Sequence, residues 1–316
     1  HIVRELCEAG FSPVVFDNLT TGHLESLQGC SAYQIYQADL RDEVEVESCF
    51  RQHVFRGVVH CGGMALLGES VHDPESYYGA NVIGGLNLLA MCKRYEVNYV
   101  VFSSTCSIYG LPEKVPIAEE HPERPASTYG RTKLAFEHAL VSYREAHRLN
   151  YLSLRYFNAA GAHPSGDLGE DHEPETHLIP NALRVAQGRL ERLVIQGRDY
   201  PTPDGTCIRD YIHVTDVARA HGAALRHLLN GGASGTVNLG GGRGYSVLEV
   251  VRACEAVTGK SIRAVDGPRR AGDVPALVAD NTRAREMLKF TPQYSNQTIV
   301  ADAWRWFSRH PRGYKS

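Results

Sequence analysis

The feature that most constrains the fold is a regular alternation of two kinds of segment in the first half of the chain. Short runs rich in β-branched residues, typical of strands, occur at residues 12–17, 31–39, 56–60, 98–104 and 151–157. They lack the apolar–polar alternation of a half-exposed strand, which predicts burial on both faces of a sheet. Segments with helical spacing separate them, at residues 43–53, 74–96 and 128–149. This order predicts an α/β fold with a doubly wound parallel sheet.

The sequence changes in character after about residue 158. Long loops rich in glycine, proline, histidine and acidic residues appear, as in residues 161–180, with helical segments between them. We therefore expect a first domain over residues 1–157 and a smaller lobe over residues 158–316. The lobe would shape a substrate cleft and interleave with the first domain at its edges.

Charge and composition exclude several classes of partner. The net charge is -3 and the pI is near 6.6, so neither nucleic acid nor an anionic membrane surface is expected. No apolar run approaches the length of a membrane span. The 8 cysteines form no C-x-x-C pair, which indicates reduced thiols in a cytoplasmic enzyme.

The first residues fit the middle of a dinucleotide-binding unit. A helix end at Gly10 is followed by the strand of residues 12–17, which ends in Asp17. In such folds the acid that ends the second strand binds the adenosine ribose. The alternative is a solvated aspartate that starts a turn. The unit's first strand and its Gly-rich, pyrophosphate-binding turn would precede His1, so we expect the sequence to be N-terminally truncated.

A second glycine-rich segment, at residues 236–257, matches a dinucleotide fingerprint only in outline. Its glycines run G-G-G-R-G, and it lies far from the main strand pattern. We favour a tight turn before a helix capped by Ser246, because Glu249 lies three positions on, as in a capping box.

The stretch STYGRTK places Tyr129 and Lys133 one helical turn apart on the same face. A phenol is a poor base at neutral pH, but a nearby ammonium and a cationic nicotinamide would both favour the phenolate. The pair is therefore a candidate general base with its tuning group. The preceding strand ends in FSSTCSIYG, which puts small hydroxyl side chains at the carboxyl edge of the sheet, where such folds bind ligands.

These stretches, with GAHPSG, DGTCIRDYIHV and PRRAGD in the second lobe, resemble the family of UDP-glucose 4-epimerases, within the extended short-chain dehydrogenase/reductases. The resemblance runs from the first residue to the last. It implies a Rossmann-type NAD-binding domain over residues 1–157, a sugar-nucleotide-binding lobe over residues 158–316, and tightly bound NAD. The implied reaction interconverts UDP-glucose and UDP-galactose through a transient 4-keto sugar.

The resemblance also implies roles for individual residues. Tyr129 would be the catalytic base, Lys133 would tune it and hold the nicotinamide ribose, and Thr105 would bind the C4 oxygen and share in the proton relay. Contacts with the cofactor would come from Asp17, Asn18, Asp39, Leu40, Cys61, Gly62, Gly63, Asn81, Tyr129, Lys133 and Phe157. Contacts with the substrate would come from Thr105, Asn158, His177, Arg209, Tyr211, Arg270, Asp273 and Leu277.

The chain departs from the family pattern at several positions. Ala65 replaces a frequent lysine, Ala80 replaces the first of two asparagines, and His177 stands where an asparagine is common. Leu277 matches a position that borders the sugar, so UDP-N-acetylglucosamine or a UDP-pentose remains an alternative substrate. The helices at residues 75–95 and 128–147 would form a homodimer interface, or would only pack on the sheet.

Other functions fit less well. A sugar-nucleotide 4,6-dehydratase needs an acid and a carboxylate after the threonine, where this chain has Cys106 and Ser107. The histidines at 163, 172 and 177 match no metal-ligand spacing, so we expect no metal site. The missing Gly-rich turn leaves open a truncated, non-catalytic binder of sugar nucleotides.

Overall fold

The computed structural model describes residues 1–30, 33–270 and 272–314, and it has the expected α/β architecture. The central sheet is parallel, with strand order β3-β4-β5-β9, and β1 and β2 form a separate parallel pair. These strands are β1 (Val14–Asp17), β2 (Gln34–Gln37), β3 (Val58–His60), β4 (Tyr99–Thr105), β5 (Asn150–Tyr156) and β9 (Gly235–Leu239). The five predicted strands are therefore present, although residues 31 and 32 of the second lie outside the described residues.

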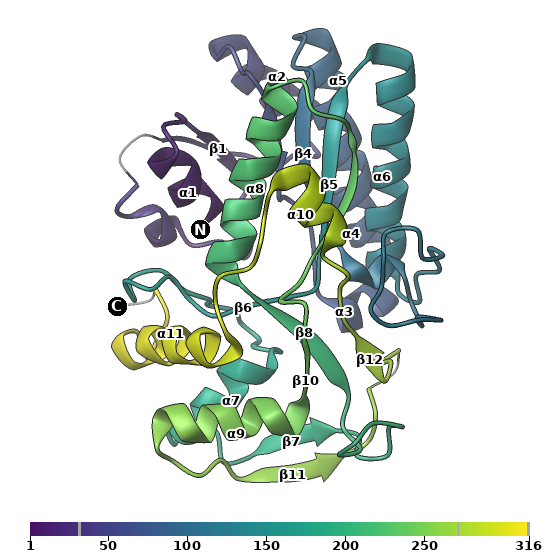
Figure 1. Cartoon of the computed structure of the whole chain (residues 1–316). Helices are drawn as coiled ribbons and strands as arrows, with labels where there is room; N and C mark the ends of the chain where they lie inside the picture. The colour runs from purple at the N-terminus through teal and green to yellow at the C-terminus, as the bar shows by residue number, and fades with distance from the viewer. Residues whose placement is uncertain (31–32, 271, 315–316) are drawn as a thin grey trace.

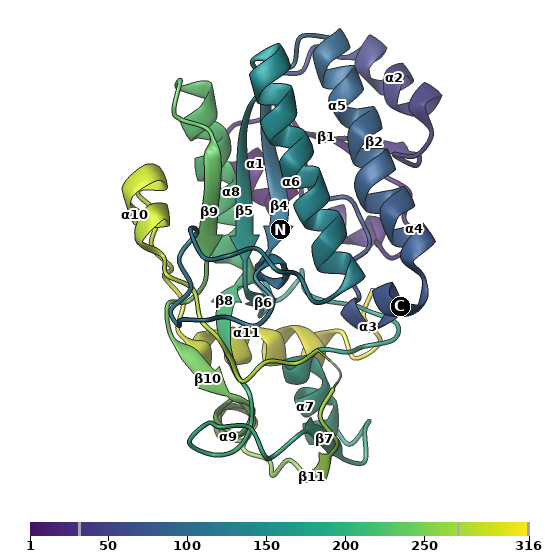
Figure 2. The same ribbon diagram turned by 90° about the vertical axis from the view of Figure 1, so that its right-hand side faces the viewer.

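Helices cover both faces of the central sheet (Figures 1 and 2). One face carries α2 (Glu43–Gln52), α5 (Gly84–Arg94) and α6 (Thr128–His147), and the other carries α1 (Ile2–Glu8) and α8 (Val214–Leu229). Apolar side chains fill both layers: Phe102 and Phe136 are buried on the first side, and Leu154 and Leu228 on the second. Burial on both faces explains why these strands lack alternation in the sequence.

The helix predicted over residues 74–96 is present as three consecutive helical segments. These are α4 (Pro74–Tyr78), a π-helical turn η2 (Gly79–Ile83) and α5. Glycines allow close packing here, because a Cβ at Gly85 would lie 2.5 Å from the ring of Phe136. The wider turn directs Asn81 into the interior, where its side chain is 2% exposed.

The second lobe is centred on β8 (Ile208–His213), which contacts three other strands. Its strands are β6 (Asn158–Ala160), β7 (Leu193–Gln196), β8, β10 (Gly244–Ser246), β11 (Ala264–Gly267) and β12 (Ala276–Leu277). Its helices are α7 (Leu178–Ala186), α9 (Val247–Thr258) and α11 (Asn296–Arg309), which share one apolar core. The remaining helical segments are η1 (Leu24–Leu27), α3 (Leu67–His72), η3 (Cys106–Ile108) and α10 (Thr282–Leu288).

The chain returns to the first sheet after entering the second lobe. β9 lies beside β5, and α8 packs on β4 and β5, although both elements follow residue 158. The carboxyl ends of the central strands thereby face the second lobe (Figure 1). In the described part of the chain, no helix combines the length and apolar character needed to span a membrane.

Candidate active site

The structure brings Tyr129, Lys133 and Thr105 together where β4 meets α6. β4 ends at Thr105, and α6 begins after Ser127, whose hydroxyl caps the helix by accepting a hydrogen bond from the backbone of Gly130 at 3.1 Å. A Cβ at Gly130 would lie 2.7 Å from the carbonyl oxygen of Ser107. Only glycine therefore lets the first turn of α6 lie this close to the backbone after β4.

These three side chains are almost completely enclosed. Tyr129 is 8% exposed, and Lys133 and Thr105 are each 6% exposed. The Lys133 ammonium donates a hydrogen bond to the carbonyl oxygen of Ser103 at 3.1 Å and lies 6.0 Å from the centre of the Tyr129 ring. The lysine is thus fixed beside the phenol without being bonded to it.

Burial, rather than a neighbouring charge, has the largest effect on the pKa of Tyr129 and on the pKa of Lys133. It raises the pKa of Tyr129 to about 12, while the Thr105 hydroxyl acts in the opposite direction. It lowers the pKa of Lys133 to about 8. The chain by itself therefore does not produce the lowered phenol pKa that the Tyr–Lys spacing suggested, because desolvation outweighs a lysine whose bond is to Ser103. Lowering the pKa of the Tyr129 phenol therefore depends on a further positive charge in the site.

A buried ion pair beneath the site was not found from the sequence. Glu137 continues the face of α6 that carries Tyr129 and Lys133, and its carboxylate accepts two hydrogen bonds from Arg155 Nε at 3.0 and 3.2 Å. Ser104, next to Thr105, donates to the same carboxylate. Arg155 and Glu137 are 2% and 3% exposed. These hydrogen bonds join β4, β5 and α6. The sequence signal for them was the position of Glu137, four residues after Lys133 on the same face of α6.

The acidic residues of the predicted cofactor site lie at the ends of β1 and β2. The Asp17 carboxylate accepts a hydrogen bond from the backbone of Leu19 at 2.7 Å. Asn18 donates to Asp39 at 2.9 Å, and Arg41 forms an ion pair with the same carboxylate at 2.8 Å. The bonds from Arg41, with that from Asn18, hold the pKa of Asp39 well below its usual range.

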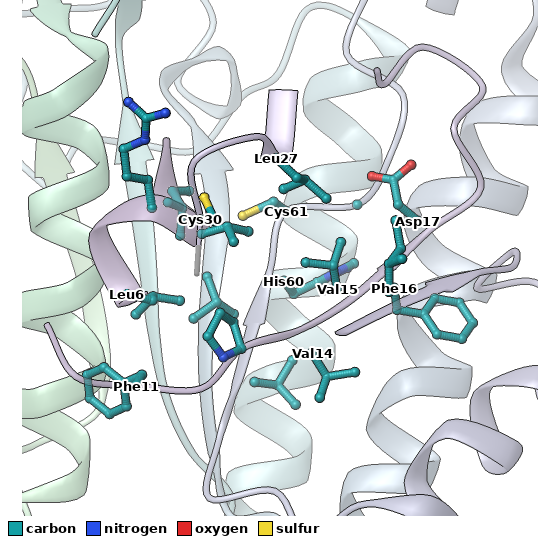
Figure 3. Close-up of a pocket in the computed structure, with 18 of the residues that line it drawn as sticks. Leu6, Phe11, Val14, Val15, Phe16, Asp17, Leu27, Cys30, His60 and Cys61 are labelled. Carbon is teal, nitrogen blue, oxygen red and sulfur yellow. The ribbon is translucent and has the colours of Figure 1, made fainter. Parts of the chain in front are cut away.

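A cavity of about 890 Å³ lies between β1 and β3, lined by Val14, Val15, His60, Leu6 and Asp17 among others (Figure 3). In the described chain, β1 pairs only with β2, and β3 pairs only with β4. One edge of each strand is therefore without a neighbour, and the ring nitrogen Nε2 of His60 is buried without a hydrogen-bond partner.

The loop after β3 is placed by Asn81. Its side chain accepts a hydrogen bond from the backbone of Met64 at 2.7 Å and donates to the Met64 carbonyl and to Thr132, at 3.0 and 2.9 Å. Gly63 has a φ of 139°, and a Cβ there would lie 2.5 Å from Asn81 Oδ1 and 3.7 Å from Lys133 Nζ. Asn81 thus fixes an exposed turn that has no side chain at Gly62 or Gly63, and Leu40 packs against Gly62.

Strand register in the second lobe gathers the predicted substrate residues. Asn158 of β6 is opposite Tyr211 of β8, and Leu277 of β12 is opposite Arg209. Arg209 also forms an ion pair with Asp273 at 3.2 Å. Arg270 lies exposed after β11, and His177 precedes α7 as its N-cap residue.

Leu277 connects the two lobes. It packs against a buried cluster that contains Cys106 and Ile108 after β4, Phe157 after β5, and Ala279. Leu277 therefore reaches the end of the strand that carries Thr105. Phe157 is 6% exposed within this cluster.

The second glycine-rich loop is occupied by a side chain of the protein. The Asp210 carboxylate accepts hydrogen bonds from the backbone of Gly241 at 2.6 Å, Gly242 at 3.2 Å and Ala279 at 3.0 Å. Burial raises the pKa of Asp210 to about 6, against the effect of these bonds. Ser246 and Glu249 form the predicted capping box. The interpretation of this loop as a structural turn is confirmed.

The chain is similar in sequence and fold to several known proteins. Residues 1–240 match the model of the NAD dependent epimerase/dehydratase family. A UDP-glucose 4-epimerase of Halalkalibacterium halodurans is 47% identical, over 100% of this chain and 94% of that protein. The crystal structure of UDP-glucose 4-epimerase from Brucella ovis in complex with NAD is 45% identical, with a TM-score of 0.93 over 97% of this chain and 94% of that one.

A third similar protein was solved with a nucleotide in place. The UDP-glucose 4-epimerase of Bifidobacterium longum, in complex with NAD⁺ and UDP, is 36% identical. Its TM-score is 0.95, over 99% of this chain and 96% of that one.

Proposed function

The chain belongs to the NAD dependent epimerase/dehydratase family, and we propose that it interconverts UDP-glucose and UDP-galactose as a 4-epimerase with tightly bound NAD. The observation that carries this proposal is the enclosure of Tyr129, Lys133 and Thr105 at the carboxyl end of β4, beside the strands that gather Arg209, Asn158 and Leu277. A phenol in this position can take a proton from a sugar hydroxyl that Thr105 orients.

The exposed, side-chain-free turn at Gly62 and Gly63 and the strand-end carboxylates of Asp17 and Asp39 fit NAD. Bound NAD would supply reversible hydride acceptance at C4 of the hexose, so no second substrate would be consumed. Its contacts would come from Asp17, Asn18, Asp39, Leu40, Cys61, Gly62, Gly63, Asn81, Tyr129, Lys133 and Phe157.

The residues of the chain then have distinct tasks. Tyr129 holds and returns the proton of the C4 hydroxyl, and Lys133 stabilises the phenolate and binds the nicotinamide ribose. Burial excludes water from both groups, which strengthens each charge interaction between them. Arg209 and Arg270 suit the diphosphate because a guanidinium matches its oxygens in a planar fork. Asn158, His177, Tyr211 and Asp273 complete the proposed nucleotide site, and Leu277 borders the sugar.

Three further assignments belong to the proposal. The boundary between the NAD domain and the sugar-nucleotide lobe lies after residue 157, with β9 and α8 returning across it. The chain forms a homodimer through the helical stretch of α4, η2 and α5 and through α6, which is supported by exposed apolar side chains of Ile83, Leu86 and Val141. It works in the cytoplasm, where the buried thiols of Cys92 and Cys254 stay reduced.

Purified chain supplied with NAD should be tested against a panel of UDP-sugars, with products separated by chromatography. We expect interconversion of UDP-glucose and UDP-galactose to be fastest. Preferred turnover of UDP-N-acetylglucosamine or a UDP-pentose would replace the substrate assignment. Binding without turnover of any of them would support the non-catalytic alternative and overturn the proposal.

A further inference from the structure

Four side chains with nitrogen and oxygen donors converge in the loop before α7. Called here the Glu/His cluster, they are Glu170, His172, Glu175 and His177. One donor atom from each residue lies within 4.8 Å of the donors of the other three. His163, the third histidine of this region, is instead near Arg4, with 3.2 Å between its Nδ1 and the guanidinium. The structure thus places His172 and His177 in the cluster and His163 outside it, a distinction that the spacing of the histidines in the sequence could not make.

Three distances within the cluster are close to those between ligands of a small metal ion. His172 Nδ1 lies 3.1 Å from Glu170 Oε1 and 3.9 Å from Glu175 Oε2, and His177 Nδ1 lies 3.5 Å from Glu175 Oε1 and is hydrogen-bonded to Glu170 Oε1. Zinc binds imidazole nitrogen and carboxylate oxygen at about 2.0–2.2 Å, so ligands at the corners of a tetrahedron are roughly 3.3–3.6 Å apart.

Glu175 gives an independent indication of an ion. Its side chain is only 1% exposed, and its Oε2 atom is buried without a hydrogen-bond partner. A buried carboxylate oxygen that lacks a donor is costly unless a cation compensates it. The cluster holds two carboxylates, so a dication would balance their charge while the histidines are neutral.

The backbone of the cluster is fixed independently of any ion. The indole of Trp306, on α11, donates a hydrogen bond to the carbonyl of Glu170 at 2.9 Å. The amide of Asn181, on α7, donates to the carbonyls of Glu175 and His177 at 3.2 and 3.0 Å. Both ends of the loop are therefore held, and little ordering would be needed to bind a ligand.

We propose that the Glu/His cluster binds one divalent transition-metal ion, with Zn²⁺ the best match. Two imidazoles disfavour Ca²⁺ and Mg²⁺, which take oxygen ligands, whereas two imidazoles with two carboxylates suit tetrahedral zinc. The bound ion links the N-terminus of α7 to the loop that Trp306 anchors. Because His177 also belongs to the proposed nucleotide site, the ion would fix the orientation of its ring there.

The site can be tested with zinc sulfate and purified chain treated first with a chelator. After equilibrium dialysis, we expect one zinc per chain and a higher melting temperature with zinc than without it. Cobalt(II) should give the visible absorption of a tetrahedral nitrogen–oxygen site, without the strong near-ultraviolet band of thiolate ligands.

Variants separate this site from adventitious binding. Glu175→Gln and His172→Ala should each weaken zinc binding by at least about tenfold. His138→Ala is the matched control, because His138 is an exposed histidine 3.9 Å from a single carboxylate, Glu123, and it should bind zinc as the unmodified chain does. If Glu175→Gln does not fold, His172→Ala keeps the test intact, since His172 is 44% exposed.

The proposal would be overturned by unmodified chain that retains no zinc, or by binding that is equal in all three variants. A dominant thiolate band with cobalt would also overturn it, because the metal would then lie at cysteines. None of these readouts depends on epimerase activity, so the metal site and the proposed function can fail separately.

Discussion

The two sides of the proposed NAD-binding domain differ sharply in how completely they are packed. On one side, β4, β5 and α6 enclose Tyr129 and Lys133 above a buried Arg155–Glu137 ion pair. On the other, β1 and β3 line a cavity of about 890 Å³, and each has a strand neighbour on one edge only within the described residues. The sites proposed for proton transfer and for adenosine binding therefore differ in how tightly they are packed. Changes to the first side should affect chemistry, and changes to the second should affect stability and cofactor retention.

The largest expected effect is on the packed side. Tyr129→Phe should lower turnover by about 10²–10⁴-fold, because it removes a positioned proton acceptor. The melting temperature should change little, since the ring stays in place. Initial rates of UDP-galactose conversion would measure this effect. Tyr143→Phe, on the same helix, is the control and should keep full activity; a Tyr129→Phe variant as active as that control would remove the phenol from the mechanism.

The cavity side can be tested by supplying a strand. An N-terminal extension designed to form a β-strand followed by a Gly-rich turn should insert its strand between β1 and β3. Pairing of both edges and burial of a few apolar side chains should raise the melting temperature by about 10 °C and increase the NAD that co-purifies.

A glycine–serine extension of equal length is the matched control for that strand. It should leave the melting temperature and the bound NAD unchanged. If the strand-bearing extension behaves in the same way, the cavity does not accept a strand, and the contrast between the two sides loses its basis.

Lys133 should make stability on the packed side depend on pH. Burial lowers its pKa from 10.5 to about 8, so between these values the unfolded chain binds a proton that the folded chain has lost. The full free-energy cost of burying the charged Lys133 side chain is therefore present below pH 8, and this cost disappears as the pH rises toward 10.5. The free energy of unfolding should rise by about 3 kcal/mol across this window relative to Lys133→Met. Denaturant titrations of both proteins would show it, and parallel pH profiles would contradict the buried ammonium.

The smallest effect concerns the contact between the lobes. Leu277→Tyr adds bulk where Leu277 packs near Cys106, so any turnover of UDP-N-acetylglucosamine should fall about tenfold more than turnover of UDP-glucose. Comparison of kcat/KM for the two substrates measures this selectivity. Leu277→Met nearly conserves volume and should change neither value much. Equal losses on both substrates in Leu277→Tyr would show that Leu277 does not limit the sugar pocket.

The sequence predicts the elements of this molecule well where local pattern decides the structure. The strand predicted at residues 98–104 is β4, and the helix predicted at residues 128–149 is α6. The capping box was also predicted correctly, since its two partners, Ser246 and Glu249, are only three residues apart in the sequence. The helix predicted at residues 74–96 is present from Pro74 to Arg94, but its π-helical turn, Gly79–Ile83, was not predicted.

The parts of the site that escaped prediction depend on contacts across the fold. Asp210 fills the loop at Gly241 and Gly242, and Arg155 joins Glu137, only because β8 and β5 bring them there. The pKa of Tyr129 is raised by burial that no spacing rule measures. The convergence of Glu170 and Glu175 on two histidines depends on the path of an irregular loop, which has no sequence periodicity.

The central claim is that the chain inverts C4 by moving its hydrogen to NAD and back within one closed site. The most direct test uses UDP-galactose labelled with deuterium at C4, incubated with the purified chain and NAD in ordinary water. We predict UDP-glucose that keeps the deuterium at C4, because hydride transfer does not exchange with solvent, and no net consumption of NAD. Loss of the label to water, or product that forms only as NADH accumulates, would contradict the account.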